Sequence, residues 1–320
     1  MNRKFLNVSE RKAGERSIRD GNTQMDGGTN ISSAVDDDDN KVRREIEALV
    51  LEQKWLKIYN TEHAFLKLQK ILVDCCRHLH VSNKLYPFLD PGSKPASSEQ
   101  LQLKQRNGMD NLKATIVLVG ENIIQSEVSL KYPKAPGGVL KTCAQPEVQW
   151  KLQQLQDARN FCCMAMNTIN KGLELVKEQS RDGNGKVRKL NDQMGNQLSM
   201  VVGVVSDCIL RACSTICLPR KRTLLELCNF PPTKCFKPPL PPDLVFSYYV
   251  ASTKVICAAY QVTSKQNDVT KTLASCELPL LVKFLSLLEQ AIEVVRELRC
   301  NFSAFDAHIN SSLSLKTGSS

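Results

Sequence analysis

The stretch that decides the fold is "QWKLQQLQDARN", residues 149–160. It contains no glycine or proline, so it favours a helix. From Val148 onward, an apolar side chain recurs every three or four residues, and this spacing continues well past the stretch. Arg159 is the one polar residue that interrupts it. This is the heptad spacing with which one helix packs along another. We name the predicted packing stripe the bundle seam; it comprises Leu152, Leu155, Cys162, Met166, Ile169, Leu173 and Val176.

The polar side chains of the same stretch lie beside the bundle seam and are the candidate partner contacts. They are Gln153, Gln154, Gln156, Asp157, Arg159 and Asn160. Two interpretations remain open for them. They are either solvated residues on the outside of a helix, or hydrogen-bonding groups for a partner. Arg159 either extends to water from the edge of the bundle or fixes register and contacts a partner.

The remaining sequence predicts a mainly α protein, an elongated antiparallel bundle of about five long helices. Apolar residues at helical spacing recur in 42–80, 187–217, 243–262 and 278–302. A small β-sheet domain is expected at one end, because residues 112–132 alternate around a Gly-Glu-Asn turn and predict a hairpin.

The predicted organisation has seven consecutive segments. They are a disordered tail (1–41), the first bundle helix and a loop (42–109), a β segment (110–146), a helical hairpin (147–217), a proline-rich β segment (218–242), the last two bundle helices (243–310) and a second disordered tail (311–320). Residues 263–277 are expected to be a short link between the last two helices.

Composition narrows the function classes. The 320 residues carry a formal net charge of +10, which is either a solvated basic surface or a surface for an acidic partner or an anionic membrane. No signal peptide and no run of 18 apolar residues occurs, so we expect a cytoplasmic or peripheral membrane protein. The "PRKR" cluster at 219–222 is either an ordinary surface loop, a site for an acidic partner, or a nuclear import signal that would allow a nuclear pool in addition. The basic residues are scattered without an aromatic platform, so we expect no binding to nucleic acid.

Chemistry-bearing motifs are missing from the sequence. The 13 cysteines include no C-x-x-C pair, and only four histidines are present. There is no G-x-S-x-G, H-E-x-x-H or complete phosphate-binding loop. We therefore predict no catalytic residue, no bound metal and no cofactor, and we do not expect an enzyme.

Three stretches together resemble the Rogdi family. They are "KATIVLVGENIIQSEVSLKYP" (113–133), "QWKLQQLQDARN" (149–160) and "PPLPPDLVFSYYVASTKVICAAYQV" (238–262), in the order that the family has them. The resemblance covers about residues 42–309 and implies an extended helical domain with a small β domain.

The resemblance also implies a function. Members are non-catalytic, leucine-zipper-type subunits of RAVE-like complexes, which assist assembly of the vacuolar proton-pumping ATPase and hence acidification of vesicles. The implied partners are a large scaffold subunit that bears β-propellers and the peripheral sector of the pump. The implied location is the cytoplasmic side of endosomal, lysosomal or synaptic vesicle membranes. The alternative is a self-associating zipper protein that serves as a scaffold or tether. Heptad spacing fits packing against a helix of the same chain and packing against a helix of a second copy in a homodimer equally well.

Overall fold

The computed structural model divides the chain into two compact units, Met1–Glu47 and Ala48–Ser320. The residues that the structure describes are 32–79, 98–106, 108, 110–180, 192–219, 226, 235–263 and 268–317. The described part of the first unit is helical and carries an exposed ion pair between Arg43 and Glu47, 3.9 Å apart.

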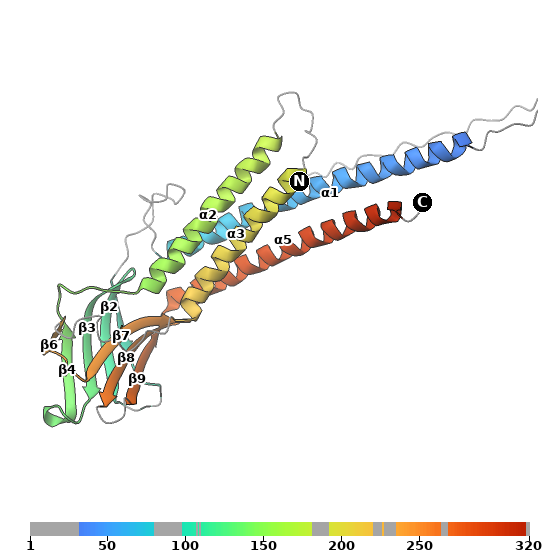
Figure 1. Cartoon of the computed structure of the whole chain (residues 1–320). Helices are drawn as coiled ribbons and strands as arrows, with labels where there is room; N and C mark the ends of the chain where they lie inside the picture. Colours follow the sequence, from blue (N-terminus) through green and yellow to red (C-terminus); the bar gives the residue numbers. More distant parts are fainter. Residues whose placement is uncertain are drawn as a thin grey trace, which may run out of the picture. The chain divides into compact units, whose positions relative to one another are not determined.

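The helices of the second unit are α1 (Ser32–His78, from residue 48 on), α2 (Gln153–Ser180), α3 (Asp192–Cys217) and α5 (Pro279–Thr317). Figure 1 shows them running beside one another. The Gln69 amide of α1 donates to Asn170 Oδ1 of α2 across 2.9 Å. The Lys57 ammonium of α1 lies 5.1 Å from the centre of the Phe302 ring of α5. With α3 packed against both α2 and α5, the four helices enclose a common apolar core.

Two antiparallel sheets lie at one end of these helices (Figure 1). Sheet A has the order β1-β2-β3-β4-β6, with β5 paired to β3, and sheet B has the order β7-β8-β9. The strands of sheet A are β1 (Ser98–Leu103), β2 (Leu112–Val119), β3 (Asn122–Lys131), β4 (Val139–Ala144), β5 (Trp150–Lys151) and β6 (Phe236–Lys237). The strands of sheet B are β7 (Leu244–Ala251), β8 (Lys254–Thr263) and β9 (Asp268–Glu277).

The two sheets pack through aromatic side chains. Trp150 of β5 meets the ring of Tyr248 of β7 edge to face, with ring centres 5.0 Å apart. Phe236 of β6 lies 5.7 Å from Phe246 of β7. The buried hydroxyls of Ser126 and Tyr248 hydrogen-bond to each other between the sheets. Large rings therefore fill the space between sheets A and B, as is usual where two sheets share one core.

The predicted five-helix bundle with a small sheet is wrong. Within the described ranges the chain has four helices and nine strands in two antiparallel sheets. The largest difference is 243–262, which was predicted to be a helix and forms β7 and β8. Almost every residue of β7 is buried, so apolar residues occur at helical spacing and at strand spacing alike. The β-branched and aromatic composition of this segment is what favours strands.

Smaller corrections concern the ends of elements. Helix α1 begins at Ser32, inside the predicted 1–41 tail, and α5 extends to Thr317, inside the predicted 311–320 tail. The predicted loop before residue 109 contains β1, and the expected 263–277 link contains β9. Residues 1–31 and 318–320 lie outside the described residues, as do residues 181–191, inside the predicted helical hairpin, and most of the segment 218–242.

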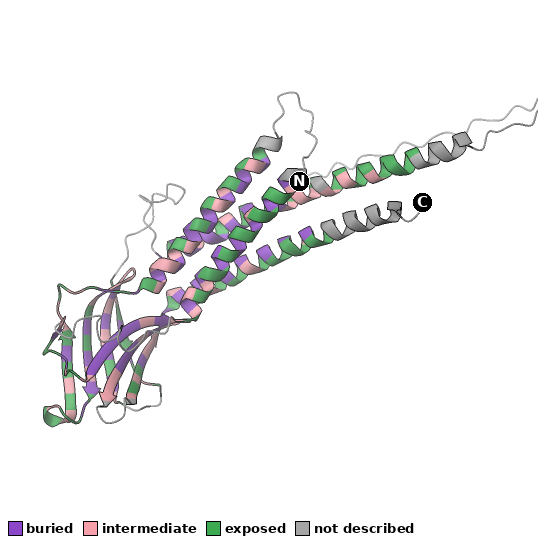
Figure 2. Cartoon of the chain, in the orientation of Figure 1, coloured by how far each residue is buried: buried purple, intermediate pink, exposed green. Residues whose placement is uncertain are grey.

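The burial pattern explains how these elements hold together. In strands β2 and β3 buried residues alternate with half-buried or exposed ones, so each strand presents one apolar face to the core. The helices bury one stripe each and expose the opposite side, as Figure 2 shows. All four helices and both sheets contribute buried apolar residues to one continuous cluster. The helices and the sheets of this unit therefore share one core.

Two helical glycines make the packing testable. A Cβ at Gly172 of α2 would overlap the ring of Phe65 of α1, whereas a Cβ at Gly203 of α3 would meet no atom within 4 Å. We expect Gly172→Ala to lower the free energy of unfolding by about 1–3 kcal/mol through overpacking. Gly203→Ala should raise it by up to about 1 kcal/mol through helix propensity. Thermal denaturation of both variants checks this; equal melting temperatures would contradict the close contact of α1 and α2.

Candidate interaction surface

The start of α2 is fixed to the sheets by its backbone and by one tryptophan. Trp150 is buried in β5, where it pairs with Ile123 of β3. The next apolar residue, Leu152, donates its N–H to the carbonyl of Glu121 across 2.8 Å. The carbonyl of Leu152 accepts from the N–H of Leu155. The sequence "QWKL" thus connects β5 of sheet A to the start of α2.

Gln154 connects α2 to sheet B. Its Oε1 accepts from the N–H of Val250 at 2.8 Å, and its Nε2 donates to the carbonyl of Val250 at 2.6 Å. The same Nε2 lies 3.3 Å from the carbonyl of Thr215 near the end of α3. One amide side chain therefore pairs with both backbone groups of a residue in β7, as a neighbouring strand would. We call Gln154 with its three backbone partners the helix–sheet junction.

Two backbone hydrogen bonds extend the helix–sheet junction to the other helices. The N–H of Ser252, in the turn between β7 and β8, donates to the carbonyl of Ile216 of α3 across 2.9 Å. The carbonyl of Thr253 in the same turn accepts from the N–H of Leu278, just ahead of α5, across 2.8 Å. The turn at 252–253 thus holds the end of α3 and the start of α5.

The other candidate contact residues are placed differently from Gln154. Gln153 and Asn160 are exposed, and Gln156 and Asp157 are half-buried. Gln153 Nε2 donates to Asp157 Oδ1 across 2.9 Å, one helical turn away. These four residues leave side-chain polar groups at the surface of α2, whereas the amide of Gln154 is used inside the fold.

Arg159, the interruption in the bundle seam, faces Glu121 in the turn between β2 and β3. Its Nη1 lies 3.4 Å from both carboxylate oxygens, and the two side chains are only 17% and 19% exposed. A largely buried arginine needs such a partner, because desolvating a lone charge is costly. The guanidinium therefore ties α2 to sheet A.

The seven residues of the bundle seam are all buried. Cys162 and its neighbour Cys163 face Cys75 and Cys76 of α1, with 3.9 Å between the sulfurs of Cys76 and Cys163. Thiol–thiol hydrogen bonding and burial raise the pKa of Cys76 and of Cys162 well above the ordinary thiol range. These thiols stay protonated at neutral pH and act as small apolar side chains.

Sheet B holds another buried thiol. Burial raises the pKa of Cys257 in β8 to about 12, although Tyr248 donates a hydrogen bond to it. A thiol is a poor nucleophile when its thiolate is this rare. Among the described residues, no group of three or more His, Cys, Asp or Glu side chains is arranged to hold a metal ion.

Asp243, just before β7, links the sheets at their polar margin. Tyr132 donates to its Oδ1 at 2.6 Å, and Lys134 Nζ lies 2.7 Å from its Oδ2. Burial alone would raise the pKa of Asp243, but the hydrogen bonds from Lys134 and Tyr132 outweigh it and lower the pKa. Burial and the hydrogen bond to Asp243 raise the pKa of Tyr132 to about 12.

Comparisons with known proteins assign the chain to a family. The family model described as "Rogdi leucine zipper containing protein" matches residues 52–310, which include α2, α3, both sheets and the larger part of α1 and of α5. The chain belongs to the Rogdi family. It is 35% identical to the "Protein rogdi homolog" of Caenorhabditis elegans over 254 residues, 77% of this chain and 85% of the relative. It is 28% identical to the Drosophila melanogaster "Protein rogdi" over 269 residues, 83% and 91% of the two chains. The human "Protein rogdi homolog" is 31% identical over 231 residues, 70% and 71% of the two chains.

The surface of this Rogdi family member has apolar features that sequence reasoning missed. On α1, Leu51, Trp55 and Tyr59 follow one another at four-residue spacing and are about half exposed, with the two rings stacked 5.5 Å apart. The predicted first bundle helix within 42–80 includes Leu51 and Trp55 among its regularly spaced apolar residues, so the sequence placed both inside the bundle. Only the packing of the other helices, which meet α1 further along the chain, shows that they are outside.

Helix α3 is the most apolar helix. Within the described part of the chain, residues 194–217 are the one helical stretch long and apolar enough by length and composition to cross a membrane. In the structure its inner side packs against α2 and α5, and 39% of its most apolar window is buried. Core helices pass the same composition test, so this feature by itself identifies no membrane span.

The helix–sheet junction predicts a specific loss of stability. Replacing Gln154 with Leu leaves the N–H and carbonyl of buried Val250 without this partner, which should cost about 1–3 kcal/mol in the free energy of unfolding. Chemical denaturation measures this loss in the free energy of unfolding. The matched control Gln153→Leu changes an exposed residue of the same helix and should stay within about 0.5 kcal/mol of the unchanged protein. If both variants lose the same stability, Gln154 is not a junction residue.

The Asp243 site predicts a dependence of stability on pH. Because the folded pKa of Asp243 is lowered, its contribution is present above the unfolded pKa of about 3.9 and is lost as the pH falls through the folded value. Asp243→Asn should therefore lower the free energy of unfolding by about 1 kcal/mol at pH 7 and by less at pH 3. Urea denaturation of the variant and the unchanged protein at both pH values measures this difference in the free energy of unfolding. Asp110→Asn removes an exposed carboxylate paired with Lys113 and should have little effect at either pH.

Proposed function

We propose that this chain is a non-catalytic subunit of a RAVE-like complex, which assists assembly of the vacuolar proton-pumping ATPase and so promotes acidification of vesicles and endolysosomes. The observation that carries the proposal is the family match over 52–310, which includes the bundle and both sheets. The partners are a large scaffold subunit with β-propellers and the peripheral sector of the pump. The chain then acts on the cytoplasmic side of endosomal, lysosomal or synaptic vesicle membranes, held there through its partners.

The build of the molecule suits such a role. The helices present long surfaces with exposed polar groups, among them Gln153 and Asn160 on α2. The helix–sheet junction and the Arg159–Glu121 pair connect this part of α2 to both sheets. A partner bound on α2 would therefore meet side chains whose backbone is already fixed, which reduces the entropy lost on binding. The protonated, buried thiols of Cys76 and Cys162 favour a structural role over nucleophilic catalysis.

Affinity purification of the full chain from cells, under mild conditions, tests the proposal. We expect the scaffold subunit and subunits of the pump's peripheral sector among the co-purified proteins. A double variant, Gln153→Lys with Asn160→Lys, should recover less of them while melting at the same temperature, because it changes only exposed side chains. Recovery of neither the scaffold nor any pump subunit by the unchanged protein would refute the proposal.

The alternative is a self-associating scaffold or tether, and one observation favours it. The exposed stripe of Leu51, Trp55 and Tyr59 on α1 is apolar enough to pair with another helix. Sedimentation of the purified protein distinguishes the two. A stable dimer that Trp55→Lys converts to a monomer would support the alternative, and a monomer at micromolar concentration would exclude it.

A further inference from the structure

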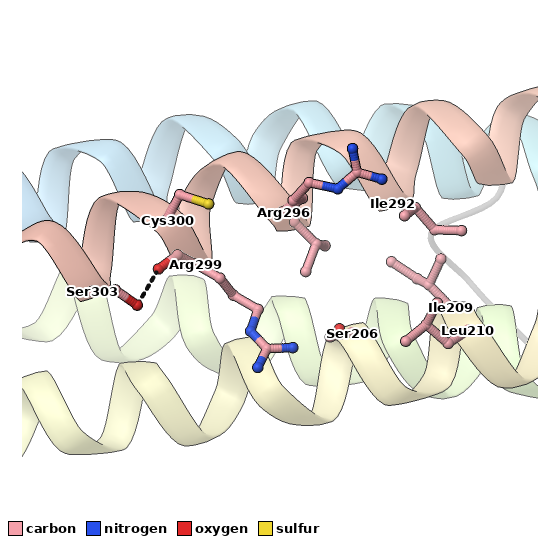
Figure 3. Close-up of a pocket in the computed structure, with 9 residues that line it drawn as sticks. Ser206, Ile209, Leu210, Ile292, Arg296, Arg299, Cys300 and Ser303 are labelled. Atoms are coloured by element: carbon pink, nitrogen blue, oxygen red, sulfur yellow. Dashed lines mark hydrogen bonds between the residues drawn. The ribbon is translucent and has the colours of Figure 1, made fainter.

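The groove between α3 and α5 carries an inference that goes further than the proposed function. It has a volume of about 590 Å³ and is lined on α3 by Ser206, Ile209 and Leu210 and on α5 by Ile292, Val295 and Arg299, with Arg296 at its margin. Figure 3 shows Ile209, Leu210 and Ile292 gathered at one end and Arg299 and Ser303 at the other. The groove is thus apolar at one end and cationic at the other.

The groove is open to solvent, although its walls are apolar. Leu210 is 50% exposed, and on the outer side of α3 Met200 and Val204 are exposed as well. Only 39% of the most apolar window of α3 is buried within the fold. A helix this apolar gains free energy when more of its surface leaves water, so its uncovered side favours a partner.

The charges of the groove indicate the chemistry of that partner. Arg299 extends from α5 toward α3 and makes no ion pair with the described side chains. Arg296, one turn earlier, pairs with Glu293 at the exposed surface across 2.8 Å. A guanidinium beside an apolar wall, with no carboxylate partner among the described side chains, is complementary to an acidic group on an otherwise apolar ligand.

The spacing of the lining residues suits a helix better than a single acyl chain. Residues 292, 295, 299 and 303 of α5 and 206 and 210 of α3 recur at three or four residues, so the walls form ridges one helical turn apart. Side chains of a third helix fit between such ridges. Next to the groove on α3, a Cβ at Gly203 would meet nothing within 4 Å, so another helix can approach α3 closely there.

We propose that the groove between α3 and α5 binds an amphipathic helix of the scaffold subunit, with the helix's apolar residues against Leu210 and Ile292 and a Glu or Asp on Arg299. This inference rests on the proposed function and assigns the binding of the scaffold subunit to a particular place on the chain. The mode is a helix laid into a groove, in which residues at three- and four-residue spacing anchor it.

Binding of the purified scaffold subunit to the full chain tests the assignment. Arg299→Glu should weaken the dissociation constant at least tenfold, because it places two carboxylates against each other. Lys283→Glu is the matched control: it makes the same charge change at an exposed position of α5 away from the groove, and should alter binding less than threefold. Equal binding by Arg299→Glu and the unchanged protein would overturn the assignment and leave the proposed function standing. Absence of binding by the unchanged protein would overturn both.

The chemistry of the occupant is tested separately with a photoreactive phenylalanine at position 210. Irradiation of the complex should link it to a segment of the scaffold that has apolar residues at helical spacing and an acidic residue one or two turns away. A cross-link to a basic or strand-forming segment, or to lipid when vesicles are added, would contradict an acidic helix as the occupant. Circular dichroism and melting temperature of each variant establish that the fold is unchanged.

Discussion

The pairing of the Gln154 side chain with the backbone of Val250 is the constraint on which the arrangement of helices and sheets depends. Strand β7 contacts α2 and α3 near its end, where its N–H and carbonyl groups would otherwise have no neighbouring strand. A buried backbone group without a hydrogen bond is costly, so this end of β7 needs a polar partner from the helices. Because the same amide also reaches Thr215, one side chain fixes where α2 begins and where α3 ends relative to sheet B.

Sequence reasoning succeeds where the two faces of an element differ. The alternation of Val128, Leu130 and Tyr132 with polar neighbours predicts a hairpin, and β2 and β3 pair at that place. The heptad spacing of α2 predicts a helix whose seam side chains are buried. It fails at 243–262, because β7 is buried on both faces and no alternation of polar and apolar residues marks the period of a strand there. It also fails at residues 98–103, where "SEQLQL" has only two strongly apolar side chains, Leu101 and Leu103, in an edge strand.

The role of Gln154 shows why the candidate surface could be predicted only in part. As one of four glutamines in a polar stretch it gives no signal of its own, and its partner lies 96 residues away. Had 243–262 been a helix, Val250 would have used its backbone groups within that helix, so the error in the fold concealed the contact. The groove between α3 and α5 was equally hidden, since it depends on how two helices far apart in the sequence come together.

The position of α3 along the chain has a consequence for biosynthesis. Helix α3 ends at Cys217, while the helix that covers part of its apolar side, α5, ends at Thr317. A ribosome that adds 5–20 residues per second needs roughly 5–20 s for the intervening 100 or so residues. During that interval the nascent chain exposes the most apolar helix of the molecule, and β7 to β9 must form in between. The newly made chain is therefore a natural client for chaperones that shield apolar helices until translation is complete.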